Sequence, residues 1–154
     1  GVRQVLGNGA ISGYPLQDVR VTVLDGKFHA VDSKEIAFVQ AGKKAFINAI
    51  GKASPIIMEP IVKVAFTVPS DCVGSVTGDL ASMRGSISGT EILTDNRSKI
   101  SGLAPLKELQ AYHSRLKSLS GGEGVYTADF SHYARVPGTT QKELVSAFQS
   151  PDGD

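Results

Sequence analysis

Hydrophobic and polar residues alternate most regularly over residues 61–68, where valine and phenylalanine occupy every second position between Pro60 and Pro69. A period of two in β-branched and aromatic residues is typical of a strand with one buried face. Proline interrupts such an element because it lacks the N–H donor. We therefore expect a strand at 61–68 and a joint between two structural units at Pro60.

Helical and strand periods then succeed one another to the end of the chain. The resulting β-α-β-β-α-β order folds as a ferredoxin-like sandwich, in which two helices cover one face of a four-stranded antiparallel sheet. The elements expected after the first strand are helices at 70–83, 105–119 and 140–148, strands at 86–93, 99–106 and 125–133, and a loose end at 150–154.

The first part of the chain predicts a smaller α+β unit. Alternating valines favour a strand at 16–24, and Asp25-Gly26 is a strong signal for a hairpin with a second strand at 27–31. Asp32 and Glu35 have the spacing of a capping box at the start of a long helix over 32–52. A helix at 1–7 and a short closing strand before Pro60 complete this unit. Because the helical pattern is already present at Gly1, we interpret the chain as a piece of a longer protein.

Composition is that of a globular protein, with 41% hydrophobic and 20% charged residues among 154. The net charge of +1 gives no overall signal for nucleic acid, although it leaves a local basic patch open. Cys72 is the only cysteine, which excludes an intrachain disulfide and favours the cytosol. No apolar run approaches the roughly 20 residues of a membrane span, so we expect no membrane partner.

The motifs of a catalytic or metal site are absent from the sequence. There is no G-x-x-x-x-G-K-[ST] phosphate loop and no nucleophile elbow. One cysteine excludes the usual cysteine-based zinc sites, and His29, His113 and His132 are far apart in the sequence. No local motif therefore supports an enzyme or a bound metal in this chain; a metal site would require the three histidines to meet in space, and a hydrolase, the third hypothesis, has no nucleophile–base spacing to support it.

Several polar residues on two helices and at one hairpin tip have either a purely structural role or a role in binding. Arg84 ends the helix at 70–83, where a positive charge favours the helix dipole or contacts an RNA phosphate. Arg115 and Lys117 lie on the outward side of an amphipathic helix, either solvated or bound to RNA. His29 lies near the hairpin tip, where an exposed side chain is either idle or part of a contact.

A series of short motifs in one order carries a family resemblance. Together they resemble the C-terminal part of bacterial elongation factor G, the ribosomal translocation GTPase, from about residue 1 to residue 137. The motifs are Gly13-Tyr14-Pro15, Asp25-Gly26-x-Phe28-His29, Met58-Glu59-Pro60-Ile61, Gly78-Asp79-Leu80, Arg84-Gly85, Pro105-Leu106 and Leu116-Lys117-Ser118-Leu119-Ser120-x-Gly122.

The resemblance implies two domains and a tail. Residues 1–59 would be the C-terminal part of domain IV, with a partial ribosomal-protein-S5-domain-2-like α+β fold, and residues 60–137 would be the ferredoxin-like domain V. Residues 138–154 would form a C-terminal tail. The GTPase domain, with its GTP and magnesium sites, would lie upstream, so this chain would hold no cofactor and hydrolyse no GTP.

The resemblance also implies partners and contact residues. Domain IV enters the decoding site of the small subunit and holds the tRNA–mRNA module. Domain V lies near the stalk base of the large subunit and its ribosomal RNA. The protein would act as a cytoplasmic monomer. The implied contacts are His29 with its flanking residues Lys27, Asp32 and Ser33 on the first domain, and Arg84, Lys117 and Ser118 on the second.

Departures from the family pattern leave alternatives open. Ala81, Ser82 and Met83 stand where family members often have arginines, and Gly121 and Glu123 stand where they commonly have bases, so fewer phosphate contacts are expected. A ribosome-protection or recycling paralogue has the same architecture. A small-molecule-binding ferredoxin-like module is the alternative from another class, and it requires a concave apolar pocket with converging polar groups.

Overall fold

The computed structural model of the chain describes residues 1–148, which form two compact units. Unit 1 comprises Gly1–Ile57 together with the segment that begins at Val136, and unit 2 comprises Met58–Arg135. The chain therefore passes through unit 2 and returns to unit 1. The expected loose end at 150–154 lies outside the described residues.

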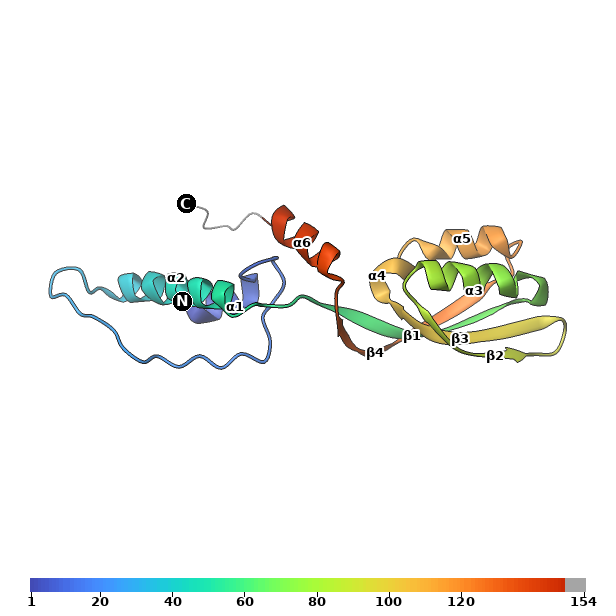
Figure 1. The fold of residues 1–154 in the computed structure, drawn as a ribbon, viewed down its shortest axis with the longest axis horizontal. Coiled ribbons are helices and arrows are strands. Elements are labelled where there is room, and N and C mark those ends of the chain that lie inside the picture. Colours follow the sequence, from blue (N-terminus) through green and yellow to red (C-terminus); the bar gives the residue numbers. More distant parts are fainter. Residues whose placement is uncertain (149–154) are drawn as a thin grey trace. The chain divides into compact units, whose positions relative to one another are not determined.

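Unit 2 is a four-stranded antiparallel sheet with helices on one face (Figure 1). The strand order β2-β3-β1-β4 places β1 in the middle, paired with β3 on one side and β4 on the other. This arrangement confirms the α+β class and the ferredoxin-like order expected from the sequence. The elements are β1 (Met58–Pro69), a 3₁₀ turn (Ser70–Cys72), α3 (Val73–Ser82), β2 (Ser86–Ile92), β3 (Arg97–Pro105), α4 (Leu106–Leu109), α5 (Tyr112–Leu119) and β4 (Val125–Arg135).

Two boundaries differ from the sequence-based expectation. β1 begins at Met58 and runs through Pro60, so Pro60 is a strand residue and not a joint. Pro60 is tolerated because β1 pairs there with β4 alone, opposite Tyr133, and the pairing with β3 starts only at Ile61. The helix expected at 105–119 is split into α4 and α5.

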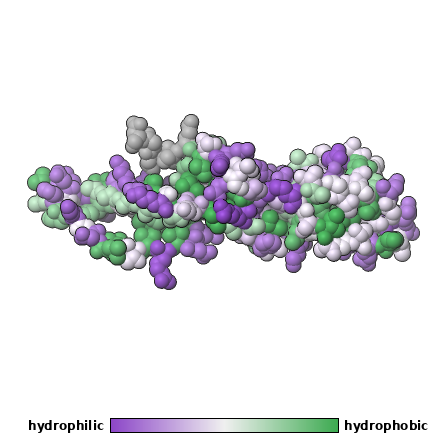
Figure 2. Space-filling model, viewed as in Figure 1, coloured by the Kyte–Doolittle hydropathy of each residue, from purple (hydrophilic) through white to green (hydrophobic). Residues whose placement is uncertain are grey.

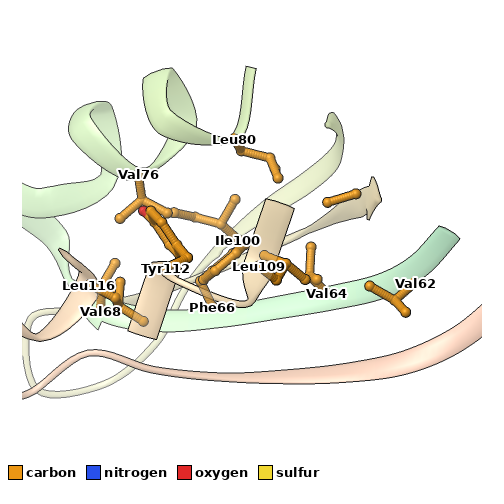
Figure 3. Packing of buried hydrophobic residues seen from close by; sticks show 11 residues of the cluster. Val62, Val64, Phe66, Val68, Val76, Leu80, Ile100, Leu109, Tyr112 and Leu116 are labelled. Carbon is orange, nitrogen blue, oxygen red and sulfur yellow. The ribbon is translucent and has the colours of Figure 1, made fainter. Parts of the chain in front are cut away.

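The core of unit 2 lies between the sheet and its helices (Figure 3). β1 supplies every second residue to it, as its alternation predicts, and Phe66 is fully buried. The ring of Phe66 packs edge-on against Tyr112 of α5, with centroids 5.6 Å apart. The buried cluster consists of Val62, Val64, Phe66, Val68, Val76, Leu80, Ile100, Ala104, Leu109, Tyr112 and Leu116.

Leu80 is fixed in this core by two glycines. A Cβ added to Gly85 would lie 2.4 Å from Leu80 Cδ1, and one added to Gly102 would lie 3.0 Å from Leu80 Cδ2 and 2.3 Å from the Ser86 carbonyl oxygen. Leu80 is fully buried, so its side chain has no free space to move into. Both glycines are therefore required for close packing.

Asp79 connects the two long helices of unit 2. Its carboxylate accepts two hydrogen bonds from the Arg115 guanidinium, at 2.8 and 2.7 Å, and one from the Tyr112 hydroxyl at 3.1 Å. The bonds from Arg115 are the main reason that the pKa of Asp79 lies below its ordinary value. Burial, with help from the Asp79 charge and its hydrogen bond, raises the pKa of Tyr112, which keeps the hydroxyl a donor.

Unit 1 has a small core of Val5, Phe46 and Ile50. Its helices are α1 (Val2–Asn8), α2 (Glu35–Lys52) and α6 (Gly138–Ala147). The helix expected at 32–52 is present, but it starts at Glu35 with Lys34 as the N-cap and no side-chain cap. The capping box expected from Asp32 and Glu35 is therefore wrong. Among the described helices of both units, none is long and apolar enough to cross a membrane.

The strands expected at 16–24 and 27–31 are also wrong, and so is the short closing strand of unit 1, because residues 54–57 form no strand and Met58 to Pro60 belong to β1 of unit 2. Residues 15–29 form a segment without helix or strand pairing. A hairpin of two strands is marginal without a third strand or a helix to cover its apolar face. Hydrophobic side chains remain at the surface of this segment (Figure 2). The exposed ones are Val19, Val21, Val23, Leu24 and Phe28, and Val31 in the following turn is also exposed.

We predict that Gly85→Ala lowers the free energy of unfolding by about 1–3 kcal/mol, because the new methyl group would overlap Leu80. Gly78→Ala is the matched control. Its Cβ would meet nothing within 4 Å, and alanine favours the helix by about 1 kcal/mol over glycine. Urea unfolding measures both changes. Equal effects of the two substitutions would contradict this packing.

We predict that Asp79→Asn lowers the free energy of unfolding at pH 7 by about 1 kcal/mol through loss of the charged contact to Arg115. A carboxylate whose folded pKa is depressed contributes stability above its unfolded pKa of about 3.9, and this stability is lost as the pH falls through the folded pKa. The difference from the wild type should therefore shrink below about pH 4.

Chemical denaturation between about pH 2 and about pH 8, a range that spans the unfolded carboxylate pKa, measures this difference. Asp129→Asn, which changes an exposed carboxylate on β4, is the control. A constant difference between wild type and Asp79→Asn over this range would show that the ion pair does not account for the effect.

Candidate RNA interface

Lys27, His29, Asp32 and Ser33 lie in one exposed stretch before α2, and hydrogen bonds between His29 and Ser33 close a turn within it. The backbone N–H of His29 donates to Ser33 Oγ at 2.5 Å, and the N–H of Ser33 donates to the His29 carbonyl oxygen at 3.0 Å. These two bonds close the turn on itself. Ser33 thus holds the backbone in place, while Lys27, His29 and Asp32 are exposed.

Arg84 lies just past the end of α3, in a backbone conformation that glycine adopts more easily. The φ angle of Arg84 is 59°. The Arg84 N–H donates to the Ala81 carbonyl oxygen at 3.2 Å, and the Gly85 N–H donates to the Leu80 carbonyl oxygen at 2.9 Å. This pair of bonds is the Schellman pattern that satisfies the last carbonyls of a helix. The left-handed turn directs the chain from α3 into β2.

Two carboxylates engage the Arg84 guanidinium. Glu59 on β1 accepts hydrogen bonds from Nη1 and Nη2 at 2.6 and 2.9 Å, and Glu108 on α4 accepts from Nε and Nη2 at 3.3 and 3.0 Å. The hydrogen bonds to the Glu59 carboxylate are the main reason that the pKa of Arg84 lies above its ordinary value. The formal charge of this cluster is −1, because one cation faces two anions. Arg84 therefore ties a strand, a helix end and a helix start together.

Lys117 and Ser118 lie at the last turn of α5. Lys117 Nζ donates to the Gly122 carbonyl oxygen at 2.9 Å, and the Gly122 N–H donates to the Lys117 carbonyl oxygen at 2.8 Å. Lys117 thus fixes the loop that leads into β4, while Ser118 is exposed.

The structure does not bring Arg84 and Lys117 together. The start of α3 lies near the end of α5, because Cys72 Sγ approaches the Leu119 carbonyl oxygen at 3.5 Å. Arg84, at the other end of α3, contacts Glu108 before α5 begins. The two cations therefore lie at opposite ends of the helix layer.

Glu59 and the Asp79–Arg115 pair are the main polar features that sequence reasoning missed. Glu59 is 8% exposed, and a charged residue inside an apolar run needs a partner when it is buried. That requirement is a usable signal, although it does not identify Arg84. The amphipathic pattern leaves Arg115 on the helix surface without a protein partner, and the structure instead pairs it with Asp79.

No group of three or more metal-ligating side chains occurs within residues 1–148. A depression of about 400 Å³ lies on the sheet of unit 2 and includes outward-facing residues of its strands. Its lining combines three charged residues with small and apolar side chains. The lining consists of Lys63, Val64, Ala65, Ser88, Lys99, Ser101, Gly102, Leu103, Thr127 and Asp129.

Comparison with known proteins assigns both parts of the chain. Residues 1–54 match the family model for elongation factor G, domain IV, and residues 56–144 match that for the elongation factor G C-terminus. A crystal structure of a protein from Thermus thermophilus is similar to this chain, with 34% sequence identity and a TM-score of 0.73. The similarity covers 94% of this chain and 22% of the Thermus protein, so the chain spans about a fifth of that protein. These matches show that the chain belongs to the elongation factor G family and corresponds to its domain IV and C-terminal regions.

Proposed function

We propose that this chain is the ribosome-contacting part of an elongation factor G-like translational GTPase that acts in tRNA–mRNA translocation. The observation that carries the proposal is the succession of the two family matches, domain IV and then the C-terminus, over residues 1–144. The exposed His29 turn lies in the domain IV match, where the family contacts the decoding site. A ribosome-protection or recycling factor of the same architecture is the alternative within this family.

The proposed contact of unit 1 is a turn with a fixed backbone. The two hydrogen bonds between His29 and Ser33 reduce the conformational entropy that the turn would lose on binding tRNA–mRNA. Lys27 and Asp32 cancel in formal charge. Recognition there would therefore depend on hydrogen bonding and shape more than on net charge.

The proposed contact of unit 2 is with large-subunit RNA near the stalk base, through Lys117 and Ser118. Arg84 is a weaker candidate, because an RNA phosphate must compete there with Glu59 and Glu108. The chain itself would catalyse no reaction. GTP and Mg²⁺ would bind to domains outside this chain, and the whole protein would work as a cytoplasmic monomer.

We predict that His29→Ala, in the full-length protein, slows single-turnover translocation on ribosomes by about tenfold, equivalent to about 1.4 kcal/mol. Binding to ribosomes should change little, because many other contacts remain. His132→Ala is the control, since it removes another exposed histidine that lies on β4. Equal translocation rates for the wild type and both variants would exclude the His29 turn as a functional contact.

We predict that Lys117→Gln weakens ribosome co-sedimentation of the full-length protein and reduces its salt dependence. Loss of one phosphate contact should lower the slope of log affinity against log salt by about 0.7–0.9. Lys107→Gln provides the control, since Lys107 is an exposed lysine on α4 outside the proposed contact. If both variants change the slope equally, net charge explains the result and the Lys117 contact is wrong.

A further inference from the structure

Arg97, the first residue of β3, carries a guanidinium that no carboxylate of the described residues holds in an ion pair. Its Nη2 donates to the Glu123 carbonyl oxygen at the long distance of 3.4 Å, and its Nε is buried without a hydrogen-bond partner. A guanidinium has several N–H donors, so the two Nη atoms of Arg97 retain donors for a further partner. Arg97 differs in this respect from Arg84 and Arg115.

Lys117 reaches the same loop from α5. Its Nζ donates to the Gly122 carbonyl oxygen at 2.9 Å, and Arg97 contacts the carbonyl oxygen of the next residue, Glu123. A carbonyl oxygen is uncharged, so neither bond neutralises its cation. The ammonium group also keeps donors that this bond does not use. Two positive charges from different elements of the fold therefore meet at consecutive residues of one loop.

The loop beside these two cations is open and has a fixed backbone. Gly121 and Gly122 have φ angles of +60° and +92°, and a Cβ added to either would meet no atom within 4 Å. Ser120 Oγ donates to the Leu116 carbonyl oxygen and accepts from the Gly124 N–H, both at 2.7 Å. A ligand can therefore approach the backbone closely, and the loop loses little conformational entropy when it binds.

Two carboxylates reduce the positive potential of the loop. Burial is the main reason that the pKa of the Cys72 thiol lies above its ordinary value, and the charges of Asp71 and Glu123 add to this effect. Both carboxylates therefore lie near Cys72. Together with Arg97 and Lys117 they make two anions and two cations, so long-range attraction is weak. Binding of an anion would depend on direct charge-assisted hydrogen bonds, which arginine makes with two phosphate oxygens at once.

We propose that Arg97 and Lys117 together bind one RNA phosphate above Gly121 and Gly122, Arg97 through its Nη atoms and Lys117 through Nζ. This inference rests on the RNA contact proposed above for unit 2. It adds Arg97, a residue of β3, to that contact. A strand and a helix then fix the position of the phosphate together. The cation on β3 also needs no release from a carboxylate, in contrast to Arg84.

Co-sedimentation of the full-length protein with ribosomes tests this site. Arg97→Gln and Lys117→Gln should each weaken binding about tenfold at fixed salt, as expected for the loss of a hydrogen bond between charged groups. The loss in the double variant should be smaller than the product of the two single losses, because both side chains contact one phosphate. Arg97→Lys should recover part of the binding, since it restores the charge but not the paired donors.

Two further variants separate the site from general effects of charge and folding. Arg135→Gln, at the far end of β4 from the loop, removes another exposed arginine and should leave binding unchanged. Glu123→Gln removes one of the repelling carboxylates and should strengthen binding about twofold to fivefold. A misfolded protein would not bind more tightly, so this gain cannot result from damage to the fold. Unchanged or weaker binding by Glu123→Gln would contradict the site.

Hydroxyl-radical footprinting of the ribosomal RNA in these complexes identifies the chemical class of the partner. The wild type should protect a short stretch of large-subunit RNA backbone, and Arg97→Gln and Lys117→Gln should lose protection at the same nucleotides. Loss of protection at different nucleotides would show two separate contacts and would overturn the inference. Weaker binding with unchanged protection would also overturn it, because an acidic protein would then face the two cations.

The binding data distinguish failure of this inference from failure of the proposed function. If Lys117→Gln binds weakly and Arg97→Gln binds like the wild type, Arg97 is not part of the contact, and the ribosomal role stands. Additive losses in the double variant would likewise overturn only the shared phosphate. Unchanged binding by both single variants would remove the RNA contact of unit 2 from the proposed function as well.

Discussion

Strand β1 is the constraint on which unit 2 depends. It pairs with β3 and β4 on its two sides, so its backbone groups are satisfied along most of its length. Every second side chain of β1 packs against α3 and α5. The requirement that Leu80 pack between Gly85 and Gly102 follows from this geometry, because the helix can approach the sheet only where side chains are absent.

The same close packing determines which cations are available to a partner. Arg84 lies just past the end of α3 and Arg115 lies on α5, and both are held by carboxylates of the chain itself. A paired arginine offers an RNA phosphate less than a solvated one, since an existing hydrogen bond must be exchanged. The RNA contact proposed for unit 2 would therefore depend more on lysines such as Lys117, whose hydrogen bond is to a carbonyl oxygen. Counting basic residues along the sequence overstates the free positive charge.

The sequence predicts unit 2 well because its central strand β1 and its helices α3 and α5 each have an apolar face that matches the period of the element. Phe66 and Val64 alternate, Val76 and Leu80 recur at helical spacing, and the order of elements leaves few topologies. Pairs such as Arg84 with Glu59 could not be predicted, because partners on different elements meet only through the tertiary fold. The hairpin at Asp25-Gly26 failed for a related reason. Local turn chemistry favours it, but a strand also needs neighbours, and none of the described residues supplies one.

The two units differ in the size of their hydrophobic cores, and this difference determines where local opening of the structure is easier. Three buried side chains form the core cluster of unit 1, against eleven in unit 2, and buried apolar area is the main source of stability. Local opening is accordingly easier in unit 1, where few contacts must be broken. Binding surfaces that adapt to a partner are found in such regions, provided that a few bonds keep their geometry. The bonds of Ser33 at the His29 turn and of Gln141 at residues 55–57 fix short stretches of backbone that no sheet holds.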